Sequence, residues 1–336
     1  MKVRVPNYFN EFKCIASECE DTCCAGWEIV IDDETHKRYE KVEGEFGEIL
    51  RSKIVKSDGE NIFLLNNGNC SFLNEKKMCE IYINLGEDHL CYTCQQFPRY
   101  TEEFLDLKEV GLSLSCPEAA RIILRKAENT TFNLSEEESL TEDEDYFNEG
   151  IDAEVLLEFL ECRNIVFNII ERNDLDLGTK AALALEFVKE VQNKIDLGDM
   201  DEISELMEEY RDENFINTLL NELECFKGKE SIKHKNLCEY LNVYKSIKHI
   251  NSNDPLGLEK ALKYFEGNEE FYLRKHKEFN EYYKENLYKF KNILVYFIFR
   301  YFMKAIFDYD VSAKIKLAII STLMIKELAV VRFIEN

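Results

Sequence analysis

Apolar side chains recur at steps of three and four residues through the second half of the chain, over 155–170 and 184–195. This spacing places them on one face of a helix. Two further stretches, 287–307 and 315–331, are richer still in apolar residues. Helices with so wide an apolar surface are buried on most sides. The pattern therefore predicts a helical bundle over residues 151–336.

The front of the chain has a different pattern. Runs rich in β-branched and aromatic residues over 27–31, 61–65 and 108–115 predict short strands. The segment 117–125 begins with Pro117 and carries an acid in its first turn, which predicts a helix. We therefore expect residues 1–127 to form a small domain of mixed α/β structure.

The two parts are joined by an acidic segment, residues 128–150. Eight of its last sixteen residues are Asp or Glu, which predicts a solvated linker. The predicted fold class is mainly α, with the small N-terminal domain packed on a C-terminal helical bundle.

Composition and charge narrow the function. The chain has 336 residues, of which 45% are hydrophobic, so it can bury a sizeable core. Its net charge of −24 argues against nucleic acid as a partner, because phosphate contacts need a basic face. A cationic partner, such as a lysine-bearing protein surface, is favoured. No apolar run approaches the roughly 20 residues of a membrane span. The first residues lack the apolar core of a secretory signal, so we expect a cytoplasmic protein.

Twelve cysteines are the most informative feature of the composition. Nine lie within the first 116 residues, and the other three are scattered. The scattered ones, Cys162, Cys225 and Cys238, are expected to be small buried hydrophobes. In a reducing compartment, clustered thiols indicate metal ligands or redox groups rather than disulfides. Four thiolates complete a zinc site or a [4Fe–4S] cluster, so we expect a metal cluster in the N-terminal domain.

The spacing of the cysteines leaves the metal open. Cys91 and Cys94 form a C-x2-C pair, but a zinc ribbon needs two such pairs. Cys116 is followed by Pro117, as at the end of the bacterial ferredoxin run, which is a hint towards iron–sulfur. The C-x3-C-x2-C triplet of radical S-adenosylmethionine enzymes is absent, because Gly26 stands at its third position.

Four motifs, taken in order, resemble those of the flagellin lysine-N-methylase family. They read CEDTCCAGWEIVIDDET, CSFL…MCEIYINLGEDHL, TCQQFPR and SCPEAAR, and the resemblance covers about residues 7–125. The helical half is similar more loosely, around 296–301. Cys91 stands where the family more often has another residue, and we treat it as an extra. Eight cysteines match the family's pattern: Cys14, Cys19, Cys23, Cys24, Cys70, Cys79, Cys94 and Cys116.

The resemblance implies methyl transfer from S-adenosylmethionine to lysine side chains of flagellin, by a protein that carries an iron–sulfur cluster. Zinc is the alternative metal. Two other functions are consistent with the same thiols. In one, the metal only staples the N-terminal domain and the protein is a binding module without catalytic activity. In the other, the thiols act as a redox sensor.

Methyl transfer requires a neutral lysine amine, and lysine has an ordinary pKa of about 10.4, so a proton acceptor is expected nearby. Glu20, Asp21 and Tyr82 are candidate catalytic residues because they lie close to cysteines in the sequence. Glu80 and Glu118 share that property. For each of them, the alternative is a solvated or helix-capping role.

The cofactor site has fewer signals. No G-x-G-x-x-G loop follows a strand, so the ordinary Rossmann-type methyltransferase site is missing. Arg99 and Arg121 each follow a cysteine and can hold a carboxylate, including that of S-adenosylmethionine. Trp27 can stack on an adenine or a methylated ammonium. Salt bridges for the arginines and a core position for the tryptophan are the alternatives.

Overall fold

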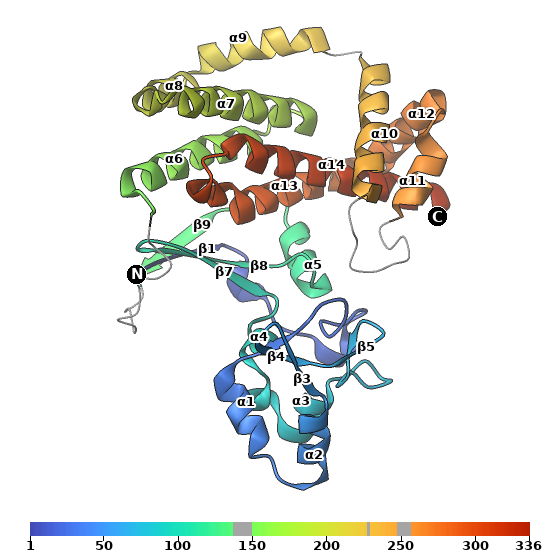
Figure 1. The fold of residues 1–336 in the computed structure, drawn as a ribbon. Helices are drawn as coiled ribbons and strands as arrows, with labels where there is room; N and C mark the ends of the chain where they lie inside the picture. The colour runs from blue at the N-terminus through green and yellow to red at the C-terminus, as the bar shows by residue number, and fades with distance from the viewer. Residues whose placement is uncertain (137–149, 227–228, 247–256) are drawn as a thin grey trace.

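Helices form most of the described chain, which comprises residues 1–136, 150–226, 229–246 and 257–336 of the computed structural model (Figure 1). The predicted mainly α class is confirmed. The helices of the N-terminal part are α1 (Asp33–Glu40), α2 (Gly44–Ser52), α3 (Glu80–Leu85), α4 (Tyr92–Gln96) and α5 (Pro117–Arg125). Those of the helical half are α6 (Ala153–Ile170), α7 (Leu177–Leu197), α8 (Ile203–Glu209), α9 (Glu213–Leu223), α10 (Glu230–Ser246), α11 (Leu258–Phe265), α12 (Glu269–Tyr282), α13 (Tyr288–Tyr301) and α14 (Val311–Glu335).

The helical half follows the hydrophobic pattern closely. The four apolar stretches lie in α6, in α7, in α13 with the 3-10 turn Phe302–Phe307, and in α14. As predicted, α13 is buried on most sides, and even Lys291 and Asn292 on it are buried. Aspartates cap α6, α7, α9 and α14. The Asp152 side chain, for example, accepts hydrogen bonds from the backbone of Glu154 and Val155.

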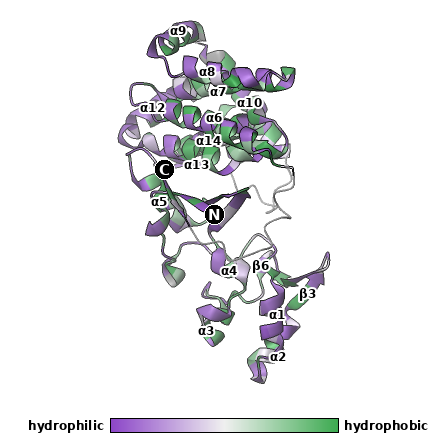
Figure 2. Ribbon diagram, turned by 90° about the vertical axis from the view of Figure 1, so that its left-hand side faces the viewer, coloured by the Kyte–Doolittle hydropathy of each residue, from purple (hydrophilic) through white to green (hydrophobic). Residues whose placement is uncertain are grey.

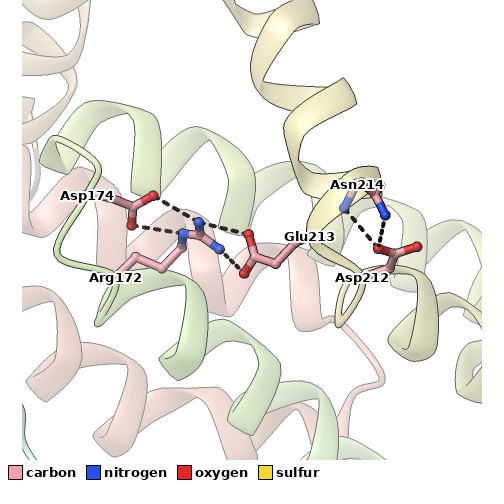
Figure 3. Close-up of polar contacts among 5 residues, drawn as sticks. All are labelled: Arg172, Asp174, Asp212, Glu213 and Asn214. Atoms are coloured by element: carbon pink, nitrogen blue, oxygen red, sulfur yellow. Dashed lines mark hydrogen bonds and ion pairs between the residues drawn. The ribbon is translucent and has the colours of Figure 1, made fainter.

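A surface network fixes the position of α9 against the end of α6 (Figure 3). Arg172 lies just after α6 and donates to Asp174 and to Glu213, the first residue of α9. Asp212 caps α9 by accepting from the Asn214 backbone at 2.9 Å. The pKa of Arg172 is raised, chiefly by its hydrogen bonds to Asp174 and secondly by those to Glu213.

A four-stranded sheet in the order β7-β8-β1-β9 lies below these helices in Figure 1. Its strands are β1 (Lys2–Pro6), β7 (Arg99–Phe104), β8 (Leu107–Leu112) and β9 (Phe132–Glu136). The central strand β1 is parallel to β8 and antiparallel to β9. The ring of Phe132 stacks on Phe167 and Phe299 at 4.8 and 4.7 Å between centroids, which joins the sheet to α6 and α13.

Strand β9 lies inside the segment predicted as a linker, 128–150. Residues 132–136 pair with β1 along the strand, so this part of the segment is built into the sheet. Its sequence, FNLSE, has only two apolar residues and leads into an acidic run, and this composition was the basis for predicting a linker. Residues 137–149 lie outside the described residues.

A buried ion group holds the sheet to the helices. Glu109 on β8 receives two hydrogen bonds from Arg163 on α6, of which Nη1 to Oε2 measures 2.7 Å, and one from Arg4 at 3.1 Å. Glu109 and Arg163 are 2% and 1% exposed. The Arg163 guanidinium also lies over the Phe167 and Phe299 rings. Removing one member of such a group would leave an uncompensated buried charge.

A separate small lobe is built from the cysteine-rich segments. Its sheet has the order β2-β4-β3, and a second pair is β5-β6. The strands are β2 (Val30–Ile31), β3 (Ile54–Ser57), β4 (Glu60–Phe63), β5 (Leu65–Asn66) and β6 (Asn69–Cys70). Figure 2 shows the lobe below the sheet, with the helices above it. The predicted N-terminal part thus contains both this lobe and most of the sheet that packs on the helices.

The predicted strands of this part are shorter than expected. Of 27–31 only Val30–Ile31 is a strand, because the preceding residues turn and the Trp27 indole donates to the Cys23 carbonyl. The run 61–65 is divided between β4 and β5, and the run 108–115 ends as a strand at Leu112. Helix α5 has the predicted bounds. Among the described helices, none is long and apolar enough to cross a bilayer.

Candidate functional site

Six thiols gather inside the small lobe. They come from the loop before β2, from β6, and from the starts of α3 and α4. Cys24, Cys70 and Cys91 belong to the buried core of the lobe, and Cys79 and Cys94 pack against it. The Cys70 backbone donates to the Cys24 carbonyl at 2.7 Å, which holds these two segments together. The six are Cys23, Cys24, Cys70, Cys79, Cys91 and Cys94.

Three of these thiols form one hydrogen-bonded set. The Cys24 thiol lies between Cys23 and Cys79 and interacts with both. The hydrogen bond from Cys24 lowers the pKa of Cys23 to about 7 and the pKa of Cys79 to about 6. The same bonds raise the pKa of Cys24, so it remains the donor. Thiolates are therefore favoured at Cys23 and Cys79.

Cys91 and Cys94 form a second set beside the first. The hydrogen bond with Cys94 lowers the pKa of Cys91 and raises the pKa of Cys94. The charges of Cys79 and Cys23 also act on Cys94, which places the two sets close together. Burial raises the pKa of Cys70 to about 11. Cys91, treated as an extra in the sequence, is fully buried within this cluster.

The remaining motif cysteines lie elsewhere. Cys116 caps α5 at the junction with α13, and Cys14 and Cys19 are close enough to act on its pKa, which burial chiefly raises. The predicted set of eight is thus divided between two places. Of the scattered cysteines, Cys162 is buried as predicted and Cys238 half-buried, but the prediction is wrong for Cys225, which is exposed.

The donor chemistry of the six thiols suits a soft metal, because thiolates prefer zinc and iron–sulfur centres. The positions of the side chains must be suitable as well. Within the described parts of the chain, no three His, Cys, Asp or Glu side chains are arranged to hold a metal ion. The described residues of the lobe therefore fit a metal centre in their chemistry, and their side chains are not arranged around a metal ion in this structure.

A polar pocket of about 470 Å³ opens beside the thiol cluster. Cys70 and Ser71 contribute to its wall, together with side-chain amides and three charged residues. The charged residues are Asp21, Glu75 and Lys77, so carboxylates outnumber the ammonium group. Asp21 accepts a hydrogen bond from the Thr22 backbone at 2.8 Å, which holds its carboxylate at the rim. A site with these walls suits a ligand that carries a positive charge and hydroxyl groups.

The structure separates the other candidate catalytic residues from this pocket. Glu20 is exposed and pairs with Arg121. Tyr82 lies on α3 with 43% of its surface exposed. Glu80 approaches Lys53 at 3.4 Å, and Glu118 pairs with Arg121 at 2.6 Å. Among the candidates, Asp21 is the one that lines the pocket.

The candidate cofactor-binding residues do not line the pocket either. Arg121 is engaged by both Glu20 and Glu118, and hydrogen bonds to these carboxylates raise its pKa. The Arg99 guanidinium is exposed and lies over the Phe12 ring at 5.3 Å. Trp27 is half-buried, with its ring 6.1 Å from that of Phe97. The two arginines were candidates because each follows a cysteine, and the tryptophan because its ring can stack on a cofactor; in the fold each contacts a different partner.

Sequence reasoning did not identify an aromatic and basic junction between α13 and the segment before Cys116. The Tyr296 hydroxyl accepts from Arg300 at 2.7 Å and from the Leu114 backbone at 3.3 Å. Arg300 also donates to Ser113 at 3.2 Å and lies 4.4 Å from the centre of the Tyr100 ring. Burial raises the pKa of Tyr100. The signal available in the sequence was the run 296–301, which resembles the corresponding region of the flagellin lysine-N-methylase family.

Comparison with known proteins supplies the family. The model of the FliB lysine N-methylase C-terminal domain matches residues 163–336, which is more than half of the chain. The chain is 34% identical over 139 residues to the flagellar biosynthetic protein FliU of Salmonella muenchen, with 36% of this chain and 76% of that protein aligned. It is 33% identical over 129 residues to a lysine-N-methylase of Salmonella typhimurium (strain LT2) and to one of Salmonella choleraesuis (strain SC-B67).

The residues that match the family model run from within α6 through α14. The chain belongs to the FliB lysine N-methylase family. It spans about a third of the length of the two Salmonella lysine-N-methylases, since 32% of each is aligned with 36% of this chain. No solved structure matches the chain.

Proposed function

We propose that the chain is a protein-lysine N-methyltransferase that transfers the methyl group of S-adenosylmethionine to lysine side chains of flagellin. The observation that carries the proposal is the match of residues 163–336 to the FliB lysine N-methylase domain. The named activity of the two Salmonella relatives supports lysine as the acceptor, and the flagellar name of the third supports flagellin.

The polar pocket beside the thiol cluster is the proposed lysine site. Lysine arrives as an ammonium ion, and the carboxylates of Asp21 and Glu75 attract it. The amine must then lose a proton before it can attack the methyl carbon. In the transfer, the nitrogen lone pair forms the N–C bond, and the electrons of the S–C bond return to sulfur, which leaves as a thioether. Asp21 is the proposed group that receives the proton and passes it to solvent.

The six thiols of the lobe are the proposed holders of a [4Fe–4S] cluster, with zinc as the alternative. When bound, the metal would cross-link the loop before β2 with β6, α3 and α4. Iron, zinc and acid-labile sulfide should be counted in protein purified without oxygen. Iron with an equivalent amount of sulfide supports the cluster, and zinc alone supports a structural site. Protein that contains neither metal would contradict both proposals.

The methyl transfer is tested with labelled S-adenosylmethionine, flagellin and anaerobically purified full-length chain. Label is expected on flagellin lysines. Asp21→Asn is expected to lower the rate by about 10²–10⁴-fold, the usual contribution of a positioned acid or base. Glu60→Gln, an exposed change on β4 outside the pocket, is the matched control and should retain the rate. Equal rates in the two variants would remove Asp21 from the site.

A further inference from the structure

A second pocket lies at the far end of the helical half, away from the thiol lobe. It has a volume of about 490 Å³ and is formed by α10, by α12 with the residue Lys284 beyond it, and by α14. Figure 1 shows these three helices gathered at one end of the bundle. The volume falls within the usual range of sites for small molecules.

The walls of this pocket are basic, although the chain as a whole is acidic. Four lysines line it, and Glu281 is the single carboxylate among the lining residues. The chain carries a net charge of −24, so such a grouping runs against the composition. The lysines are Lys233 on α10, Lys277 on α12, Lys284 after α12, and Lys326 on α14.

Two lysines near the pocket have a carboxylate partner, and the pocket lysines can be compared with them. Lys275, two residues before Lys277 on α12, pairs with Glu278 at 2.6 Å, and Lys260 pairs with Glu335 at 3.0 Å. Within the described ranges, none of the ion pairs involves the four pocket lysines. Four ammonium groups therefore surround a concave space whose lining residues include one carboxylate, that of Glu281.

The back of the pocket is firmly held and partly buried. His276 lies 2.7 Å from a Glu327 carboxylate oxygen, and Tyr272 donates to the other oxygen at 3.5 Å. The Lys326 ammonium is half-buried against this wall, and burial, followed by the charge of Lys233, lowers its pKa. The charges of Glu327 and Asp176 oppose this shift, and an anion bound in the pocket would oppose it further.

Asn280 adds an unpartnered polar group. It lines the pocket, and its Oδ1 atom is buried with no hydrogen-bond partner among the described residues. A side-chain amide offers an acceptor and two donors, and its orientation can be reversed. A ligand with several oxygen atoms can therefore satisfy this group together with the lysines.

We propose that this pocket binds a small polyanion that carries phosphate groups. Lysine ammonium groups bind phosphate oxygens as point charges, and four of them around one cavity match a ligand with several negative charges. The site is separate from the thiol lobe, and the proposal does not depend on methyl transfer.

The probe is tripolyphosphate, titrated by calorimetry into the full-length chain at low salt, with citrate as the carboxylate comparison. Tripolyphosphate is expected to bind more tightly than citrate, and less tightly as salt is added. Lys326→Gln is expected to weaken its binding about tenfold, because a charged hydrogen bond is lost. Lys326→Arg should retain most of the affinity, since the charge is preserved.

Lys275→Gln is the matched control, since Lys275 lies on α12, does not line the pocket and already has a partner. It should bind tripolyphosphate as the unchanged chain does. Lys277→Gln, at an exposed position that folding should tolerate, provides a second reduction in affinity. The proposal is overturned if tripolyphosphate does not bind, if citrate binds as tightly, or if Lys275→Gln weakens binding as much as Lys277→Gln.

Discussion

The small lobe and the helical half differ in how much apolar surface they bury. The main core of the helical half, with its share of the sheet, contains thirty-two buried apolar residues, whereas the core of the lobe contains ten, and three of those are cysteines. A core of that size leaves little stability after the cost of ordering the chain. The comparison indicates that apolar burial supplies most of the stability of the helical half. The proposed metal site would supply to the lobe what its small core does not.

Of the changes considered, removal of the proposed metal should have the largest effect on the stability of the lobe relative to that of the helical half. Chelation of protein that was purified with its metal is expected to unfold the lobe, because structural metals contribute about 10–16 kcal/mol to such sites. Hydrogen exchange should then rise sharply over residues 24–94 and stay slow over residues 159–188. Slow exchange in both regions after complete metal loss would show that the lobe is stable without it.

Within the helical half and its sheet, a substitution in the buried Glu109–Arg163–Arg4 group should cause a large loss of stability. Arg163→Met is expected to lower the free energy of unfolding by about 3–5 kcal/mol, because Glu109 remains buried with Arg4 alone. Adding Glu109→Gln should recover part of this loss. Arg211→Met, which breaks exposed pairs, is the control and should change little. Urea unfolding measures all three. A loss under about 1 kcal/mol in Arg163→Met would contradict the account.

A smaller, pH-dependent effect is expected within the lobe. Burial tends to raise the pKa of Asp32, but hydrogen bonds from the backbone of Tyr92 and Thr35 outweigh it and lower the pKa below its ordinary value of about 3.9. The ionised group therefore stabilises the lobe above that value, and the contribution is lost as the pH falls through the lowered pKa.

Asp32→Asn is accordingly expected to cost about 1–2 kcal/mol at pH 7. The difference from the unchanged chain should shrink in acid, because both side chains are then neutral. Denaturation of the lobe, followed at several pH values, measures this difference. A gap that stays constant from neutral pH to strong acid would show that the charge of Asp32 is unimportant.

The smallest effect is expected at the surface network of Figure 3. Arg172→Ala should cost less than about 1 kcal/mol, because the side chains of Asp174 and Glu213 are 59% and 67% exposed. The loss in melting temperature should diminish as salt is added. A loss as large as that of Arg163→Met would mean that exposure does not distinguish the two ion groups.

The sequence predicted helices α5, α6 and α14 well because their signals are local. Helix α5 has its proline and acid at the start, and α6 and α14 follow the apolar spacing. The sheet was only partly predicted, because β1 pairs with strands more than a hundred residues away and β9 is mostly polar. Such pairing is decided by the tertiary structure.

The candidate site shows the same limit. Cysteine counting indicated a cluster, but spacing could not divide the motif into six thiols in the lobe and three near α5. The pocket at Asp21 and the basic pocket at Lys326 each combine segments that the sequence separates. Proximity to a cysteine in the sequence selected Asp21, which lines the pocket, and it also selected Glu20, which the fold pairs with Arg121.

The most direct measurement for the central claim is the mass of flagellin after incubation with the metal-containing chain and S-adenosylmethionine. The account predicts flagellin species heavier by one or more methyl groups, located by fragmentation on lysine side chains. Flagellin of unchanged mass, with intact protein that has its full metal content, would contradict the assignment of methyl transfer to this fold.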